Sequence, residues 1–141
     1  MAPTGRILLH TNIVIALFAG EAAVRRGVEE AEAIFIPVIA LGELHYGARQ
    51  SARAAANLDR LAAFAAAAAV LACDQATAAA YGELKAVLRA QGTPIPENDI
   101  WIAALARQHA LRLVSRDAHF AVVPGLDLVR WEDDPKSPTS R

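Results

Sequence analysis

Short apolar runs alternate along the chain with longer segments in which apolar residues recur at helical spacing. The short runs are typical of buried strands and occupy residues 6–9, 34–36, 70–72, 111–114 and 126–130. The longer segments predict helices from residue 13 and over 22–33, 38–50, 52–68, 77–91 and 100–109. Because parallel neighbours need crossover connections, this alternation predicts an α/β fold with a mostly parallel central sheet of about five strands and helices on both faces.

Residues with defined backbone preferences mark several boundaries. Asp74 is expected to cap the helix that follows the third strand. The Thr-Pro-Ile-Pro segment at 93–96 predicts a loop, since proline fixes φ and restrains the residue before it. Asn98 or Asp99 is then expected to cap the helix over 100–109.

The length and composition indicate one globular domain. With 141 residues, 55% of them apolar and 21% charged, the chain can bury a core and is too weakly charged for a disordered protein. Residues 1–132 are expected to form the domain, and 133–141, which lack an apolar anchor, a flexible tail. The longest apolar stretch, 61–73, is shorter than the ~20 residues that a membrane span needs.

Charge and cysteine content restrict the function classes. The chain has 14 Lys and Arg against 15 Asp and Glu, so no overall positive field attracts nucleic acid and any such contact must be local. The single cysteine, Cys73, excludes an internal disulfide and a cysteine-based zinc site. It fits a reducing compartment, and we expect the cytoplasm.

Ligands of open parallel sheets bind at the carboxyl ends of the strands, so the residues that directly follow the strands are the first candidates for chemistry. In this chain they are His10, Thr11, Asn12, Ser115 and Asp117.

Three carboxylates are candidates for a shared site, although each also has an ordinary structural explanation. Glu43 lies in a mostly apolar helical segment, or else on a solvent-facing stripe near Arg49. Asp99 could be only a helix cap and Asp117 only a turn residue. Together they could project toward one sheet edge, and such an oxygen-rich cluster suits Mg²⁺ or Mn²⁺, which can activate a water for attack on a phosphodiester.

Other polar residues carry weaker signals. The remaining histidines lack metal-ligand spacing and are interpreted as surface or structural residues: His45, His109 and His119. The arginines of the segments after the first two strands could line an RNA groove along a dimer, or form a solvated helix face: Arg25, Arg26, Arg49, Arg53 and Arg60.

Four segments resemble, in order and spacing, the four acidic motifs of PIN-domain ribonucleases. They are ILLHTNIVIALF, IPVIALGELHYGARQS, PENDIWIAALA and LVSRDAHF. The resemblance covers residues 6–131, and GELHYGA with the short length is most similar to the VapC toxins of bacterial VapBC toxin–antitoxin systems. It implies a PIN-like fold in which Glu43, Asp99 and Asp117 hold one or two divalent ions. It also implies supporting roles at the strand ends for Thr11, Asn12 and Ser115.

The resemblance implies an activity and partners as well. A water activated by Mg²⁺ or Mn²⁺ would cleave RNA endonucleolytically, in structured molecules such as transfer or ribosomal RNA. The chain would form a homodimer. A cognate VapB-like antitoxin would obstruct the acidic site with its C-terminal segment and bring the complex to operator DNA.

His10 stands where the family has its first aspartate, which is a direct metal ligand. The replacement removes a negative charge and an oxygen donor, so we expect weaker Mg²⁺ binding. An imidazole could bind Mn²⁺, Zn²⁺ or Ni²⁺ instead, or, if protonated, pair with the remaining acids in place of a cation.

Two explanations of His10 remain open. The chain could be an inactivated form of a toxin whose natural residue is aspartate, selected during cloning of a lethal gene or introduced deliberately. Alternatively, His10 is native, and the protein is either a degenerate PIN domain that binds its antitoxin without cleaving RNA or a ribonuclease with altered metal use.

Overall fold

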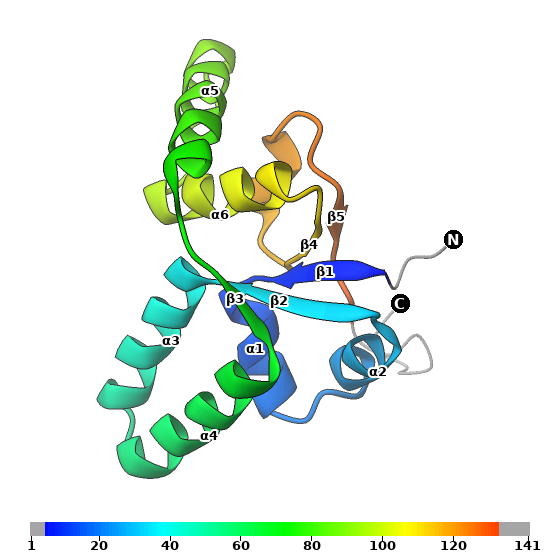
Figure 1. Ribbon diagram of the computed structural model, residues 1–141, viewed down its shortest axis with the longest axis vertical. Helices are drawn as coiled ribbons and strands as arrows, with labels where there is room; N and C mark the ends of the chain where they lie inside the picture. Colours follow the sequence, from blue (N-terminus) through cyan, green and yellow to red (C-terminus); the bar gives the residue numbers. More distant parts are fainter. Residues whose placement is uncertain (1–4, 133–141) are drawn as a thin grey trace.

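A five-stranded parallel sheet in the order β3-β2-β1-β4-β5 runs through the molecule (Figure 1). The computed structural model describes residues 5–132, so the tail expected at 133–141 lies outside the described residues. The strands are β1 (Arg6–Leu9), β2 (Ala33–Pro37), β3 (Ala69–Leu71), β4 (Arg112–Val114) and β5 (Leu128–Val129). Each neighbouring pair is parallel, which confirms the predicted fold class.

Helices cover both faces of the sheet. They are α1 (Thr11–Phe18), α2 (Ala22–Glu30), α3 (Val38–Gln50), α4 (Ala54–Ala67), α5 (Gln75–Gln91) and α6 (Glu97–Gln108), with a 3-10 helix η1 at Ala118–Val122. In Figure 1, α1 to α4 lie below the sheet, and α5 and α6 lie above it. Within the described part of the chain, no helix combines the length and hydropathy needed to cross a membrane.

The central strand β1 lies in the middle of the hydrophobic core. Its Ile7, Leu8 and Leu9 have no exposed surface, as expected for a parallel strand covered on both faces. Ile102 and Leu105 of α6 are equally buried. This packing fixes α6 against the sheet and thereby sets where its first turn lies.

Helix α6 begins three residues before the predicted start. Pro96 is its N-cap, and the Pro96 carbonyl accepts hydrogen bonds from the N–H groups of Asp99 (3.0 Å) and Ile100 (3.1 Å). The prediction that Asn98 or Asp99 caps this helix is therefore wrong. Both residues lie inside the first turn, where their side chains are not needed for capping and can point into a site.

Helix α5 begins with a capping box, and Asp74 is the cap as predicted. The Asp74 carboxylate accepts the Thr77 N–H at 3.0 Å, and the Thr77 hydroxyl accepts the Asp74 N–H at 2.9 Å. Asp74 also accepts the side-chain amide of Gln108 from the end of α6, at 2.9 Å. The Thr77 N–H first, and then the Gln108 amide, lower the pKa of Asp74, and these bonds join α5 to α6.

Candidate active site

The carboxyl ends of β1 and β4 lie side by side, and the residues that follow them form the first part of the site. Leu9 pairs with Val114, and the next N–H, that of His10, donates to the Val114 carbonyl at 3.0 Å. His10 and Ser115, which follow these two strands, are thus neighbours although 105 residues separate them. This juxtaposition follows from the parallel pairing predicted from the sequence.

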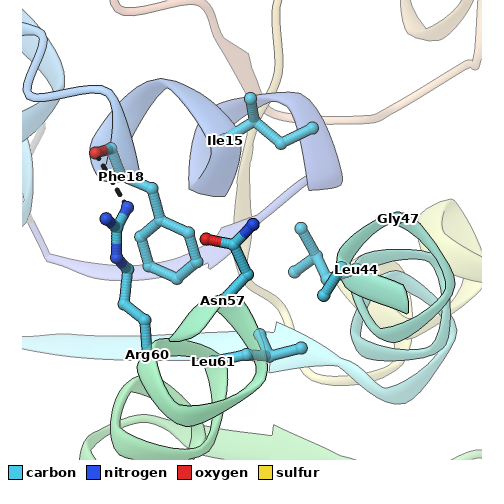
Figure 2. Close-up of a pocket in the computed structure, with 8 residues that line it drawn as sticks. Ile15, Phe18, Leu44, Gly47, Asn57, Arg60 and Leu61 are labelled. Atoms are coloured by element: carbon cyan, nitrogen blue, oxygen red, sulfur yellow. Dashed lines mark hydrogen bonds between the residues drawn. The ribbon is translucent and has the colours of Figure 1, made fainter. Parts of the chain in front are cut away.

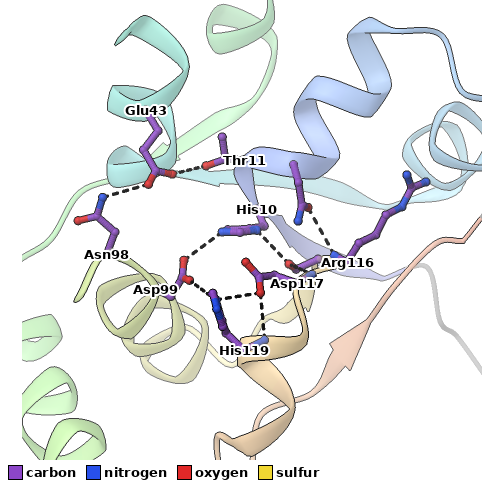
Figure 3. Close-up of polar contacts among 10 residues, drawn as sticks. His10, Thr11, Glu43, Asn98, Asp99, Arg116, Asp117 and His119 are labelled. Carbon is purple, nitrogen blue, oxygen red and sulfur yellow. Dashed lines mark hydrogen bonds and ion pairs between the residues drawn. The ribbon is translucent and has the colours of Figure 1, made fainter. Parts of the chain in front are cut away.

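His10 is buried, with 6% of its surface exposed, and both ring nitrogens have partners. Nδ1 lies 2.9 Å from the Ser115 hydroxyl, and Nε2 lies 3.1 Å from Asp99 Oδ1 (Figure 3). The Ser115 oxygen already accepts the N–H of Asp117 at 3.0 Å, so its own proton is available to Nδ1. Because an ionised carboxylate can only accept hydrogen bonds, Nε2–H is the donor to Asp99. His10 thus contacts one of the remaining acids, while its action as a protonated substitute for a cation stays a prediction.

Asp99 is the most enclosed carboxylate of the site, with 6% exposure. Imidazoles contact both of its oxygens: His10 contacts Oδ1, and His119 Nδ1 lies 3.1 Å from Oδ2. Burial raises the pKa of Asp99, but the hydrogen bonds from His10 and then from His119 outweigh it and hold the pKa below the ordinary value. Asp99 is therefore a buried carboxylate that stays ionised.

His119 is exposed at the surface, as the sequence interpretation held, but it also lines the cleft, which that interpretation did not expect. Its Nδ1 lies 2.8 Å from Asp117 Oδ1, in addition to its contact with Asp99. The sequence carries a modest signal for this placement, because His119 stands two positions after a strand-end aspartate. His45 and His109, the other histidines interpreted in this way, do not line the cleft.

Glu43 faces the same cleft from α3. The Thr11 hydroxyl donates to one carboxylate oxygen of Glu43, and the Asn98 amide donates to the other at 3.0 Å. Glu43 therefore points inward rather than along a solvent-facing stripe near Arg49. Sequence reasoning treated Asn98 only as a helix cap and missed this contact, because the earlier start of α6 turns its side chain toward α3.

The cleft has a volume of about 590 Å³. The residues that line it lie directly after β1, in α1, α3 and α6, and at the start of η1, and they include His10, Thr11, Asn12, Glu43, Asp99, Asp117 and His119. The side chain of Asn12 accepts the Arg116 N–H at 3.4 Å, which links the turn after β1 to the turn after β4. Arg25, Arg26 and Arg49 are not among the lining residues, and their contact with RNA stays a prediction.

The cleft has two sides. Ligand atoms of Asp99, Asp117 and His119 all lie within 4.8 Å of one another, so these residues could hold a metal ion. Glu43, with Thr11 and Asn98, forms the other side in Figure 3. A phosphodiester that entered the cleft would lie between a carboxylate–imidazole cluster and a separately anchored carboxylate.

A smaller apolar pocket of about 280 Å³ adjoins the cleft between α1, α3 and α4 (Figure 2). Ile15 lines both cavities and is 57% exposed. Arg60, an RNA-groove candidate from the sequence, lies at this pocket. Its guanidinium donates to the Phe18 carbonyl at 3.1 Å and lies 5.2 Å from the centre of the Phe18 ring.

Comparison with known proteins agrees with this geometry. A family model described as PIN domain matches residues 7–126. The chain is 35% identical over 129 residues to "Ribonuclease VapC2" of Haemophilus influenzae, covering 89% of this chain and 98% of that protein. It is 32% identical over 96 residues to "Ribonuclease VapC4" of Mycobacterium tuberculosis, covering 67% of this chain and 74% of that protein.

Solved structures show the same fold. The chain superimposes on the structure of VapBC2 from Rickettsia felis bound to a DNA fragment from its promoter, with a TM-score of 0.83, 29% identity, and coverage of 90% of this chain and 99% of that one. The structure of DNA-bound VapBC from Salmonella typhimurium gives a TM-score of 0.83 and 28% identity, with coverage of 90% and 98%.

Proposed function

The chain belongs to the PIN domain family, and on that premise we propose that it is the ribonuclease toxin of a toxin–antitoxin pair. The observation that carries the proposal is the convergence of Glu43, Asp99 and Asp117 in one cleft at the carboxyl edge of the sheet. Similarity to VapC ribonucleases over most of the chain supports the same activity. The proposed substrate class, structured RNA such as transfer or ribosomal RNA, rests on the resemblance of the four motifs.

The family implies a divalent cation, and the donor set fits one. Asp99, Asp117 and His119 would hold the ion, with Glu43 facing it across the cleft. The set fits an all-oxygen magnesium site less well, because His10 replaces a carboxylate and imidazoles contact both oxygens of Asp99. When bound, the ion would activate a water and polarise the phosphodiester.

The chain's own residues have distinct roles in this proposal. Thr11 and Asn98 hold the two oxygens of Glu43 in place, so Glu43 can accept a proton from an attacking water without first reorienting. His10 fixes Asp99 but adds no negative charge to the cleft. We therefore expect slower cleavage in Mg²⁺ than an aspartate at position 10 would give.

The proposed partner is a VapB-like antitoxin, as in the VapBC complexes that the fold resembles. We propose that its apolar C-terminal side chains occupy the pocket of Figure 2 and that the segment continues past Ile15 to obstruct the cleft. With a formal net charge of −1, the chain would reach operator DNA only through this antitoxin. Homodimer formation is a further expectation from the family.

A second candidate function is antitoxin binding without cleavage. The observation that favours it is the pairing of Asp99 with two imidazoles, which satisfies this buried carboxylate without a metal ion. Such a binding module would keep its antitoxin affinity when the three acids become amides.

RNA cleavage distinguishes the two candidates. Purified protein is incubated with transfer and ribosomal RNA in Mg²⁺, Mn²⁺ or Zn²⁺, with Glu43→Gln as the control for contaminating nucleases. The toxin proposal predicts metal-dependent cleavage by the protein that Glu43→Gln lowers at least about 100-fold. Equal cleavage by Glu43→Gln would contradict it, as would the absence of cleavage by both the protein and its His10→Asp form.

A further inference from the structure

Asp99, Asp117 and His119 place two carboxylate oxygens and one imidazole nitrogen around one point of the cleft. We propose that this trio binds a transition-metal ion of the Zn²⁺, Co²⁺ and Ni²⁺ class through His119 Nδ1, in preference to Mg²⁺. The inference rests on the proposed function, because it concerns the metal of the same cleft. It adds a ligand, His119, that is not one of the acidic residues of the four motifs.

The distances between the donor atoms suit a shared ion. His119 Nδ1 lies 2.8 Å from Asp117 Oδ1 and 3.1 Å from Asp99 Oδ2. Ligands bound to one ion at about 2.1 Å lie about 3.0 Å from each other when their bonds meet at a right angle and about 3.4 Å at the tetrahedral angle. His119 Nδ1 therefore stands at ligand spacing from both carboxylates, and the ligand atoms of all three side chains lie within 4.8 Å of one another.

The donor types decide which ion is preferred. Magnesium favours six oxygens and gives up its waters reluctantly, so an imidazole in the set lowers its affinity relative to other ions. Imidazole suits Zn²⁺, Co²⁺ and Ni²⁺, and sites with three protein ligands leave positions for water and substrate. Here the side chain of His119 is 46% exposed and that of Asp117 is 28% exposed, which leaves solvent access on that side.

His10 acts in this proposal as a positioning residue. It contacts Asp99 Oδ1, which leaves Oδ2 as the oxygen that faces His119. Ser115 in turn holds His10 through Nδ1. Hydrogen-bonded partners of this kind fix the orientation of metal-ligating carboxylates and raise metal affinity.

Calorimetric titration of the untagged, chelator-treated full chain tests the proposal. Cys73→Ser is the background, so that the exposed thiol does not bind metal. We expect one Zn²⁺ per chain, bound at least about 100-fold more tightly than Mg²⁺, and weakening of Zn²⁺ binding by at least about tenfold in His119→Ala and His119→Gln. Co²⁺ should give visible bands typical of fewer than six ligands, and His119→Ala should remove them.

His45→Gln is the matched control, because His45 is an exposed histidine outside the cleft. Thermal unfolding of each variant verifies that it is folded. Unchanged Zn²⁺ affinity in both His119 variants would overturn the proposal, as would Mg²⁺ binding as tight as Zn²⁺. If RNA cleavage fails while His119-dependent Zn²⁺ binding persists, the proposed function is wrong and this site stands. If RNA cleavage occurs but Zn²⁺ binding does not depend on His119, the proposed function stands and the proposed His119 metal site is wrong.

Discussion

Replacing His10 with aspartate tests whether His10 stabilises the buried carboxylate of Asp99 in the metal-free protein. The substitution removes the Nε2 hydrogen bond to Asp99 and places a second carboxylate beside one that has 6% exposure. It also restores the oxygen donor expected at this position. We therefore predict that His10→Asp makes the metal-free protein less stable and makes its stability respond to Mg²⁺.

The size of the expected loss in stability follows from the contacts of His10. Loss of a hydrogen bond to a charged group costs about 1.5–3 kcal/mol. Two carboxylates about 5 Å apart repel by about 3 kcal/mol at an effective dielectric constant near 20, although one of them can take up a proton and limit this cost. A net loss of about 3 kcal/mol in the free energy of unfolding is expected in the metal-free variant.

Magnesium should reverse this loss. We expect His10→Asp to bind Mg²⁺ at least roughly tenfold more tightly than the parent, about 1.4 kcal/mol. At a Mg²⁺ concentration near 100 times its dissociation constant, the variant would gain about 2.7 kcal/mol. The parent would gain less at the same concentration.

Urea unfolding in EDTA and across a Mg²⁺ series measures both effects, with titration calorimetry for the affinities. His10→Asn is the control, since it alters the hydrogen bond without adding charge. In EDTA, the free energy of unfolding of His10→Asn should be about 1–2 kcal/mol below that of the parent. Added Mg²⁺ should not stabilise this variant more than it stabilises the parent. Equal stability of parent and His10→Asp in EDTA, or equal Mg²⁺ affinities, would refute this account of the site.

Three further predictions concern other parts of the molecule. Asp74→Ala should lower the midpoint of thermal unfolding at neutral pH. Because the pKa of Asp74 is lowered in the folded protein, the difference in midpoint between parent and variant should be complete above pH 3.8 and should shrink as the pH falls below this value. Ser115→Ala should leave His10 Nδ1 without its buried partner and cost about 1–3 kcal/mol in urea unfolding, and an unchanged midpoint would show that this hydrogen bond is unimportant. Ile15→Asp should weaken antitoxin binding by at least about tenfold in a pull-down titration while changing stability by less than about 0.5 kcal/mol, and undiminished binding would remove the apolar pocket from the proposed interface.

The sheet and its central strand were predictable because buried parallel strands are apolar along their whole length. The run Ile7 to Leu9 is such a strand, and it became the centre of the sheet. Parallel pairing then placed the residue after β1 beside the residue after β4, so the neighbourhood of His10 and Ser115 followed from strand order and direction.

The missed parts of the site depend on side-chain directions that a linear pattern does not contain. Asn98 turns toward Glu43 because the Pro96 carbonyl, rather than a side chain, caps α6. His119 turns toward Asp99 from a 3-10 helix whose Phe120 is buried against the core. A short polar segment after a strand has no hydrophobic periodicity, so the sequence does not predict the direction of the His119 side chain.

We propose that the carboxylates of this cleft form one site for RNA cleavage. The most direct test compares cleavage of transfer and ribosomal RNA in Mg²⁺ by His10→Asp and by His10→Asp combined with Asp99→Asn. We expect His10→Asp to cleave these RNAs, the double variant to have lost the activity, and the parent protein to cleave more slowly than His10→Asp. Undiminished cleavage after Asp99→Asn would contradict the assignment of the site, and the absence of cleavage by every form would leave antitoxin binding as the function.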